Sequence, residues 1–490
     1  MTKYAILFFL IMICWNGKCS EVSDIGYFNV QNNNFRHPTS EILIIDSILI
    51  KGHERTRRKI ITRELTFMEG DTVSVEQMPT LMTMNRKRLV NTNLFSVVTF
   101  SIIRGDDPRH VKLEIFLIEK WYIYPGLIFS YGDRNPYVWL HDYHGKLDRV
   151  NYGLRMNHFN TTGQRDPLTL TLQGGYTQKI ALAYTLPFFD KKQRWGFATD
   201  VFYAKNHELG YITQNNIVPT LIDTINSLSR STGFDFTFLY RPALFATHYM
   251  SAGYSANFIN PIVVSEANNP NFFGNGKTDQ KYLWLSYTFQ HDTRDLAPYP
   301  SRGHNLVASL GMYGLLKTDD VHNLQASFRY SQYFPITDRW STAQVFKIKT
   351  DLLRNNQPYN FNHAIGYGND ILHGYDHYAV EGLDFAYVKN SLRYEFISTD
   401  FKLNKVPVIR NKIWKGFWDV PLRCYLTANV DAGYAHLPDD LTPNTFNNRL
   451  MYGYGVGVDI VLYHNIVIQL DYSFNHTGEG GFFYRQKSSF

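Results

Sequence analysis

The feature that most constrains this chain is an alternation of apolar and polar residues, repeated in segments of about 10 residues between Trp121 and Phe490. The clearest segment covers residues 451–463, where an apolar series alternates with a small or polar one. The apolar series is Tyr452, Tyr454, Val456, Val458 and Ile460, and the other is Gly453, Gly455, Gly457 and Asp459. Because successive side chains of a strand point to opposite faces, the pattern predicts strands with one apolar face and one polar face.

About 16 such segments are separated by loops, which predicts a mainly β fold built on a 16-stranded antiparallel transmembrane barrel. They cover residues 121–131, 148–160, 165–175, 178–187, 193–206, 231–242, 245–258, 281–291, 303–315, 321–334, 340–353, 386–400, 422–435, 451–463, 465–475 and 480–490. Long connections follow strands 1, 5, 7, 11 and 13, and short ones follow strands 4, 6, 10 and 14. This asymmetry is typical of the outer and inner ends of an outer-membrane barrel, although the connections after strands 3 and 12 do not follow it.

Composition agrees with a barrel whose strands show apolar side chains to a bilayer only at every second residue. Aromatic residues make up 16% of the chain, while the mean hydropathy is only −0.28. Beyond the N-terminal leader, no apolar run approaches the roughly 18 residues that a spanning helix needs. Composition alone fits a soluble all-β protein equally well; the leader, the strand count and the aromatic outer face favour the membrane barrel.

The N-terminus has the pattern of a secretory signal. Lys3 precedes an apolar stretch from Tyr4 to Cys14, so residues 1–19 are predicted to be a signal peptide and residues 20–40 a flexible leader. Two of the three cysteines lie in this signal, which leaves Cys424 without a partner for a disulfide or a cysteine metal site. The net charge of +6 is thinly spread and predicts no nucleic-acid surface.

Residues 41–120 predict a separate small α+β domain. A strand over residues 42–51 ends at Gly52, and helices are expected over residues 57–65, with Thr56 as N-cap, and over residues 75–91. Strands at 95–103 and 111–118 follow, joined by a turn. The expected order is therefore β-α-α-β-β.

This order resembles a POTRA domain, with Lys51-Gly52-His53 closing the first strand and Asn93-Leu94-Phe95 opening the second. The barrel region carries motifs that resemble those of the BamA/TamA-like outer-membrane translocases and insertases. One is Leu372-His373-Gly374-Tyr375, inside a glycine-bearing loop over residues 355–385. Together the matches cover roughly the whole mature chain and imply one POTRA-like periplasmic domain (41–120) followed by a barrel (121–490).

The resemblance implies that the 355–385 loop folds into the barrel and is latched there. Relatives carry an arginine where this chain has His373, followed by Gly374 and Tyr375. Asp431, in Asn429-Val430-Asp431-Ala432-Gly433, corresponds to the carboxylate that receives that arginine. Strand parity also turns Arg393 and Glu395 inward one strand away, so Asp431 and Glu395 are the candidate partners of His373.

Two further motifs belong to the same resemblance. Asp292, Arg294, Asp295 and Gly303 form a D-x-R-D…G turn, in which Arg294 is expected to pair with Asp292 or Asp295. The chain ends in Phe490, which is the position of a C-terminal assembly signal in an outer-membrane barrel.

The function implied by the resemblance is insertion or translocation of unfolded β-rich polypeptides by strand pairing, in a Gram-negative-type outer membrane. Expected partners are outer-membrane lipid, client polypeptides and accessory periplasmic or lipoprotein subunits. No nucleophile elbow, zinc-helix motif or phosphate-binding loop occurs, so no enzymatic activity, metal or cofactor is expected. A passive porin-like channel and a lipid-handling barrel remain as alternatives.

Overall fold

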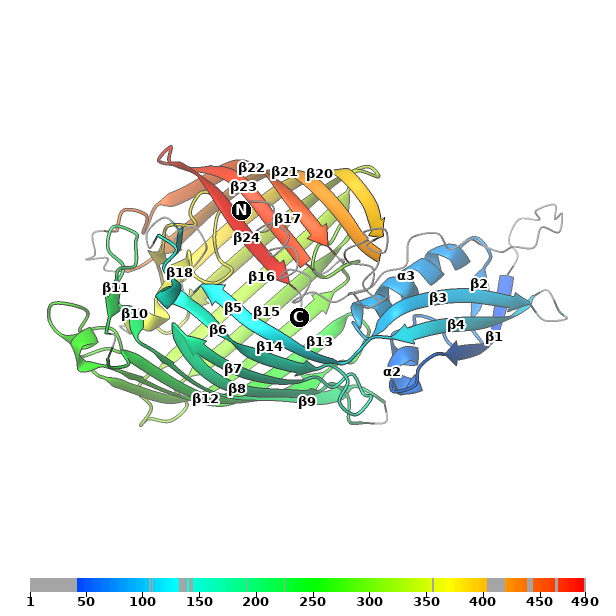
Figure 1. Ribbon diagram of the computed structural model, residues 1–490, viewed down its shortest axis with the longest axis horizontal. Coiled ribbons are helices and arrows are strands. Elements are labelled where there is room, and N and C mark those ends of the chain that lie inside the picture. The colour runs from blue at the N-terminus through cyan, green and yellow to red at the C-terminus, as the bar shows by residue number, and fades with distance from the viewer. Residues whose placement is uncertain are drawn as a thin grey trace.

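The computed structural model describes residues 42–104, 107, 109–131, 139–140, 144–190, 192–223, 225–354, 357–402, 419–438, 444–462 and 466–488. A small α+β domain lies beside one end of a large β-barrel (Figure 1). We call that end of the barrel proximal and the opposite end distal. The predicted signal peptide and flexible leader lie outside the described residues.

The small domain is a four-stranded sheet covered by two helices. Its elements are β1 (Ile42–Lys51), α2 (Arg58–Arg63), β2 (Thr72–Ser74), α3 (Met78–Asn91), β3 (Phe95–Arg104) and β4 (His110–Glu119). The sheet order is β2-β1-β4-β3, in which only the β1–β4 pair is parallel. The predicted order of helices and strands is thus observed, with β2 as an additional short strand.

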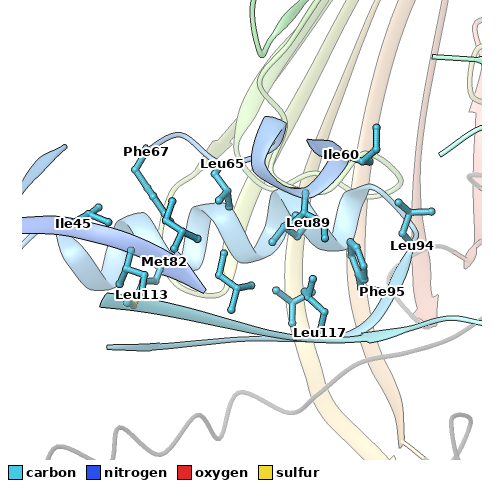
Figure 2. Packing of buried hydrophobic residues seen from close by; sticks show 14 of the residues in the cluster. Ile45, Ile60, Leu65, Phe67, Met82, Leu89, Leu94, Phe95, Leu113 and Leu117 are labelled. Atoms are coloured by element: carbon cyan, nitrogen blue, oxygen red, sulfur yellow. The ribbon is translucent and has the colours of Figure 1, made fainter. Parts of the chain in front are cut away.

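The core of this domain lies between α3 and the sheet. Leu89 of α3 and the inward Leu113 and Leu117 of β4 belong to this core, and all three are fully buried (Figure 2). Gly52 ends β1 with φ +82°, and a Cβ there would lie 1.9 Å from the carbonyl oxygen of Leu117. Glycine is therefore required for both the backbone conformation and the close approach.

The barrel is a 16-stranded antiparallel sheet, and each of its strands overlaps one of the predicted segments. Its strands are β5 (Ile123–Tyr131), β6 (Val150–His158), β7 (Leu168–Gly175), β8 (Thr177–Leu186), β9 (Trp195–Asn206), β12 (Ser229–Tyr240), β13 (Ala246–Ile259), β14 (Asp279–Asp292), β15 (Gly303–Tyr313), β16 (Asn323–Pro335), β17 (Trp340–Asp351), β20 (Asp384–Lys402), β21 (Asp419–His436), β22 (Leu450–Leu462), β23 (Ile466–Asn475) and β24 (Gly480–Ser488). They pair with their chain neighbours from β5 to β24.

The two faces of the barrel strands follow the predicted parity. On β22, Tyr452 and Val456 are 48% and 63% exposed, whereas the inward Asp459 is buried. Inward Asp471 on β23 is buried as well. A slip of one residue would move both carboxylates to the apolar outer face, so the register is strongly specified.

Short elements cover the distal end (Figure 1). They are the hairpin β10 (Glu208–Gly210) and β11 (Thr220–Ile222), the pair β18 (His363–Ile365) and β19 (Val380–Glu381), and the 3-10 helices η1 (Leu147–Arg149), η2 (Pro261–Val264) and η3 (Tyr359–Phe361). An apolar cluster there joins loops from several strands: Leu228, Ile259, Val263, Phe272, Phe273 and Tyr359. Among the described residues, no helix is long and apolar enough to cross a bilayer.

The small domain contacts the proximal turns of the barrel through hydrogen bonds. Thr56 is not the N-cap of α2, because Arg57 occupies that position. The Thr56 hydroxyl instead lies 2.8 Å from the Tyr122 hydroxyl and accepts a hydrogen bond from Asn160 at 3.0 Å. Arg57 N–H donates to the carbonyl of Gly163. Thr56 is therefore a junction residue, which a capping pattern cannot reveal.

A buried carboxylate also holds the junction. Glu64 of the small domain accepts hydrogen bonds from Arg88 at 3.0 Å and from Arg241, in a proximal turn of the barrel, at 2.8 Å. Burial by itself raises the pKa of the Glu64 carboxyl, but Arg241, Arg165 and Arg88 together lower that pKa to about 2. The ionised carboxylate is thus stabilised by contacts from both domains.

This geometry predicts an acid-sensitive junction. Because the folded pKa of Glu64 lies below its ordinary value of 4.5, its contribution is complete above about pH 4.5 and is lost as pH falls towards 2. The full contribution is about 3 kcal/mol. Thermal unfolding of the wild type and of Glu64→Gln between pH 6 and pH 2.5 measures it. The difference between the two should shrink as pH falls; curves that stay parallel would contradict the assignment.

Candidate functional site

A loop between β17 and β20 lies inside the barrel wall and forms the centre of the site. Its buried side chains include Ile365, Leu372 and Tyr375, each with no exposed surface. They pack on inward residues of the wall in one apolar cluster, which also contains Phe385, Tyr387, Ala435 and Met451. We call residues 363–381 the inward loop. Residues 363–381 of the predicted 355–385 loop therefore pack inside the barrel.

His373 of the inward loop contacts Asp431 of β21 directly. The imidazole Nδ1 lies 2.7 Å from Oδ2 of Asp431, and the backbone N–H of His373 donates to the same oxygen at 3.0 Å. The prediction of Glu395 as a second candidate partner was wrong, because Lys389 is the β20 residue opposite Asp431. Glu395 lies six residues further along β20, about 20 Å away, and accepts from the Tyr425 hydroxyl.

Two glycines allow the inward loop to approach the wall so closely. Gly374 has φ +81°, and a Cβ there would lie 2.6 Å from the backbone of Phe474 on β23. A Cβ on Gly453 of β22 would lie 1.9 Å from the carbonyl oxygen of His373. The glycines of β22, which in the sequence only marked a small inward face, thus include one that seats the loop.

Tyr375 anchors the loop next to the last hairpin. Its hydroxyl donates to the carbonyl of Tyr452 at 3.1 Å and lies 2.5 Å from Nδ1 of His476, in the β23–β24 turn. Neighbouring Tyr378 also hydrogen-bonds Glu479 in that turn. Both tyrosines therefore bind the loop to the turn that precedes the final strand.

The strongest ionic contact of the site was not anticipated from the sequence. Arg485 of β24 makes two hydrogen bonds to Asp376 of the inward loop, at 2.5 and 2.8 Å, and a third to Asp471 of β23 at 2.8 Å. Both carboxylates are buried. The permanent positive charge of this latch thus comes from the barrel and the carboxylate from the loop. An arginine at an inward position of the last strand was the available signal.

The other side of the inward loop is held by lysines. Lys347 of β17 contacts Asp370 at 2.6 Å, and Tyr387 donates to the same carboxylate at 3.0 Å. Lys389 of β20 binds the carbonyl of Ile371. Together with Asp431 and Arg485, these contacts fasten the loop to four strands, from β17 to β24.

Arg393 belongs to a second cluster, nearer the proximal end. Its guanidinium lies over the ring of Tyr299 at 4.3 Å and donates to the carbonyl of Pro300 at 3.1 Å. Tyr299 donates to the buried carboxylate of Asp459 at 2.9 Å. Arg393 therefore holds the β14–β15 turn against the wall instead of contacting the inward loop.

The D-x-R-D…G turn lies at this proximal end. Arg294 pairs with Asp292 at 2.6 and 2.8 Å, while Asp295 accepts from Ser301 at 2.7 Å. Gly303 has φ +92°, and a Cβ there would meet the Thr293 carbonyl oxygen at 2.3 Å. These contacts shape the turn itself. Phe490 lies outside the described residues, among which no cluster of metal-ligating side chains occurs.

Comparison with known proteins defines the class. Residues 159–398 match the Omp85 superfamily domain. The structure resembles BamA from Haemophilus ducreyi lacking POTRA domains 1–3, with 14% identity, a TM-score of 0.52 and coverage of 91% of this chain and 85% of that one. It also resembles CdiB from Escherichia coli, with 11% identity, a TM-score of 0.54 and coverage of 91% and 76%. No curated protein sequence matches.

The fold and the matched domain define an outer-membrane-type β-barrel preceded by one POTRA-like domain. Its barrel carries the Omp85 superfamily domain over residues 159–398.

The contacts of the inward loop predict how its variants behave. Arg485→Gln removes the guanidinium that pairs with the buried carboxylates of Asp376 and Asp471, so it should free the loop at a cost of about 3 kcal/mol or more. His373→Ala should loosen the loop less, whereas His373→Arg restores a permanent charge opposite Asp431 and should tighten it. Protease protection or hydrogen exchange of residues 366–381 measures how firmly each variant holds the loop.

The lipid-facing change Val456→Ile on β22 serves as the control, because Val456 is 63% exposed and does not face the loop. Equal protection of the loop in the wild type, Arg485→Gln and His373→Ala would show that these side chains do not latch it.

Proposed function

We propose that this protein inserts or translocates β-rich polypeptides at an outer membrane by pairing client strands with the seam between β5 and β24. One observation carries the proposal. Every other pair of neighbouring strands forms a backbone ladder, but within residues 123–131 and 480–488 no ladder joins β5 to β24. Both strands lie on the front wall in Figure 1.

A seam at which the described residues form no backbone ladder is reactive towards another strand. Each unsatisfied N–H or C=O in the hydrocarbon region costs several kcal/mol, so a client strand that supplies the missing partners is strongly favoured. An exposed strand edge is also the usual template for adding an extended peptide through main-chain hydrogen bonds. A client can therefore bind through its backbone, with little dependence on its side chains.

The small domain offers a first docking surface for an extended client. Among the described residues β3 is an edge strand of its sheet, and the sheet face opposite the helices exposes Leu49, Phe116 and Ile118 at 40–46%. An edge beside an apolar face suits a strand with alternating side chains. We infer that the proximal end faces the periplasm, where this domain would receive unfolded clients, with or without accessory subunits.

The inward loop would control the seam. β24 is held by its ladder to β23 on one edge and by the Arg485–Asp376 pair from inside the lumen. Through Asp431 and Lys347 the same loop is fixed to strands that stay paired. The loop would thus keep β24 aligned while the edge of β24 that faces β5 pairs with the client strand.

Site-directed crosslinking tests the proposal. With the buried Cys424 replaced by serine, single cysteines at Leu127 of β5, Phe482 of β24 and, as the control, Leu310 of β15 are compared; all three positions are exposed on the outer face. A stalled β-rich client should crosslink at the first two positions and not at the third. Equal crosslinking at all three positions, or none at the seam, would contradict strand pairing there.

A passive channel would share the barrel and would not need the small domain. If the small domain receives clients, deletion of residues 42–119 should abolish client insertion while leaving the barrel folded. Retained activity after the deletion would favour the channel.

A further inference from the structure

A cavity of about 960 Å³ lies between the small domain and the proximal mouth of the barrel. On one side it is lined by α3, including Pro79 and Met84, and on the other by proximal turns and strand ends, including Phe245 and Tyr249. A volume of this size is in the range of sites that bind small ligands or short peptide segments. The strand pairing proposed for β5 and β24 does not involve this cavity.

The lining carries an excess of positive charge. Its six basic residues are Lys87, Arg88, Arg165, Arg241, Arg294 and Arg302, and its three acidic residues are Glu64, Asp292 and Asp295. Asp292 is occupied by Arg294, and Asp295 mainly holds its own turn. The single carboxylate of Glu64 is then shared by Arg88, Arg165 and Arg241, at 3.0, 3.9 and 2.8 Å.

A fourth guanidinium adds to this imbalance. Arg63 stacks on Phe188, which lines the cavity, at 3.9 Å, and its buried Nε has no hydrogen-bond partner among the described residues. Burial, together with the nearby Arg241, lowers the pKa of Arg63 to about 10. The nearby carboxylates of Asp166 and Asp190 accept hydrogen bonds from backbone N–H groups of their own turns. Among the described residues, the carboxylate of Glu64 therefore offsets only part of the positive charge of these four guanidinium groups.

An anion with a planar pair of oxygens complements such a cluster. Guanidinium groups bind carboxylates through two parallel hydrogen bonds, and charge-assisted bonds of this kind are about twice as strong as neutral ones. The described contacts of Arg88 use only Nε and Nη2, both towards Glu64. Lys87 and Arg302, with side chains on the accessible rim, extend the positive surface outward.

The position of the cavity favours a polypeptide over a bilayer lipid. The barrel residues that line it, such as Leu239, Tyr249 and Gln290, alternate with Phe238, Met250 and Tyr287, which are exposed on the outer face. The lining residues therefore face the lumen, away from the hydrocarbon. A chain moving from the small domain towards the barrel wall would pass this opening.

We propose that the cavity binds a carboxylate of an extended client polypeptide, held by Arg88, Arg165 and Arg241. The identity of the ligand as a client rests on the proposed function; the anion site itself does not. Either a C-terminal carboxylate or an acidic side chain supplies the required group.

Peptide binding to the full-length protein in detergent micelles tests the site. The probes are one fluorescent hexapeptide with a free C-terminal carboxylate, its C-terminal amide, and an amide that carries an internal aspartate. The free acid should bind at least about tenfold more tightly than the neutral amide. The affinity of the amide that carries an aspartate shows whether a side-chain carboxylate is sufficient for binding.

Variants with opposite expected effects on acid binding make the test specific. Arg88→Gln should remove the preference for the acid, whereas Glu64→Gln removes the competing carboxylate and should strengthen acid binding. Arg339→Gln, in an exposed turn at the same end of the barrel, should change nothing. If the buried variants fail to fold, Arg302→Gln and Lys87→Gln at the rim should still weaken acid binding.

Equal affinity for acid and amide, or an unchanged preference in Arg88→Gln and in the rim variants, would overturn the proposal. Binding of phosphatidylglycerol, with no binding of the free acid, would assign the cavity to lipid and also overturn the proposal. Acid binding that persists while clients fail to crosslink to β5 and β24 would keep the anion site and reject the proposed function.

Discussion

The pairing of backbone groups along a barrel wall is the constraint on which the rest of this structure depends. In hydrocarbon, an N–H or C=O without a partner is far more costly than in water, so every strand needs a neighbour on both edges. Fourteen of the sixteen strands have described ladders on both edges, and β5 and β24 each have one. The apolar outer face, the register and the glycines of β22 all follow from building such a wall around a filled lumen.

The inward loop explains how a wall with a weak seam keeps its shape. Its contacts run from Lys347 on β17 to Arg485 on β24, so it spans the part of the barrel that ends at the seam. In this chain the loop supplies His373 and Asp376, and the permanent positive charge, Arg485, lies on the last strand. The loop thus contacts the strand that, among the described residues, has a backbone ladder on one edge only.

Period-two alternation predicted each barrel strand, because a membrane wall imposes the same pattern along its whole length. The three-residue β2 is too short to carry a pattern, and it forms because Thr72 and Val73 pair with β1. Glu395 was expected near His373 because the alternation of the strand turns its side chain inward. The alternation does not show how far along the barrel axis an inward side chain lies. The β20–β21 register sets that depth and places Lys389 beside Asp431. The Arg485–Asp376 pair joins residues 109 positions apart, so no local pattern indicates it.

The seam is the central claim of this account, and amide hydrogen exchange in a lipid nanodisc tests it most directly. The amides of β5 and β24 that do not bond to β6 or β23 should exchange much faster than those of β15 in the client-free protein. They should become protected when a client strand is bound. Protection equal to that of β15 without a client, or no change on adding one, would contradict the account.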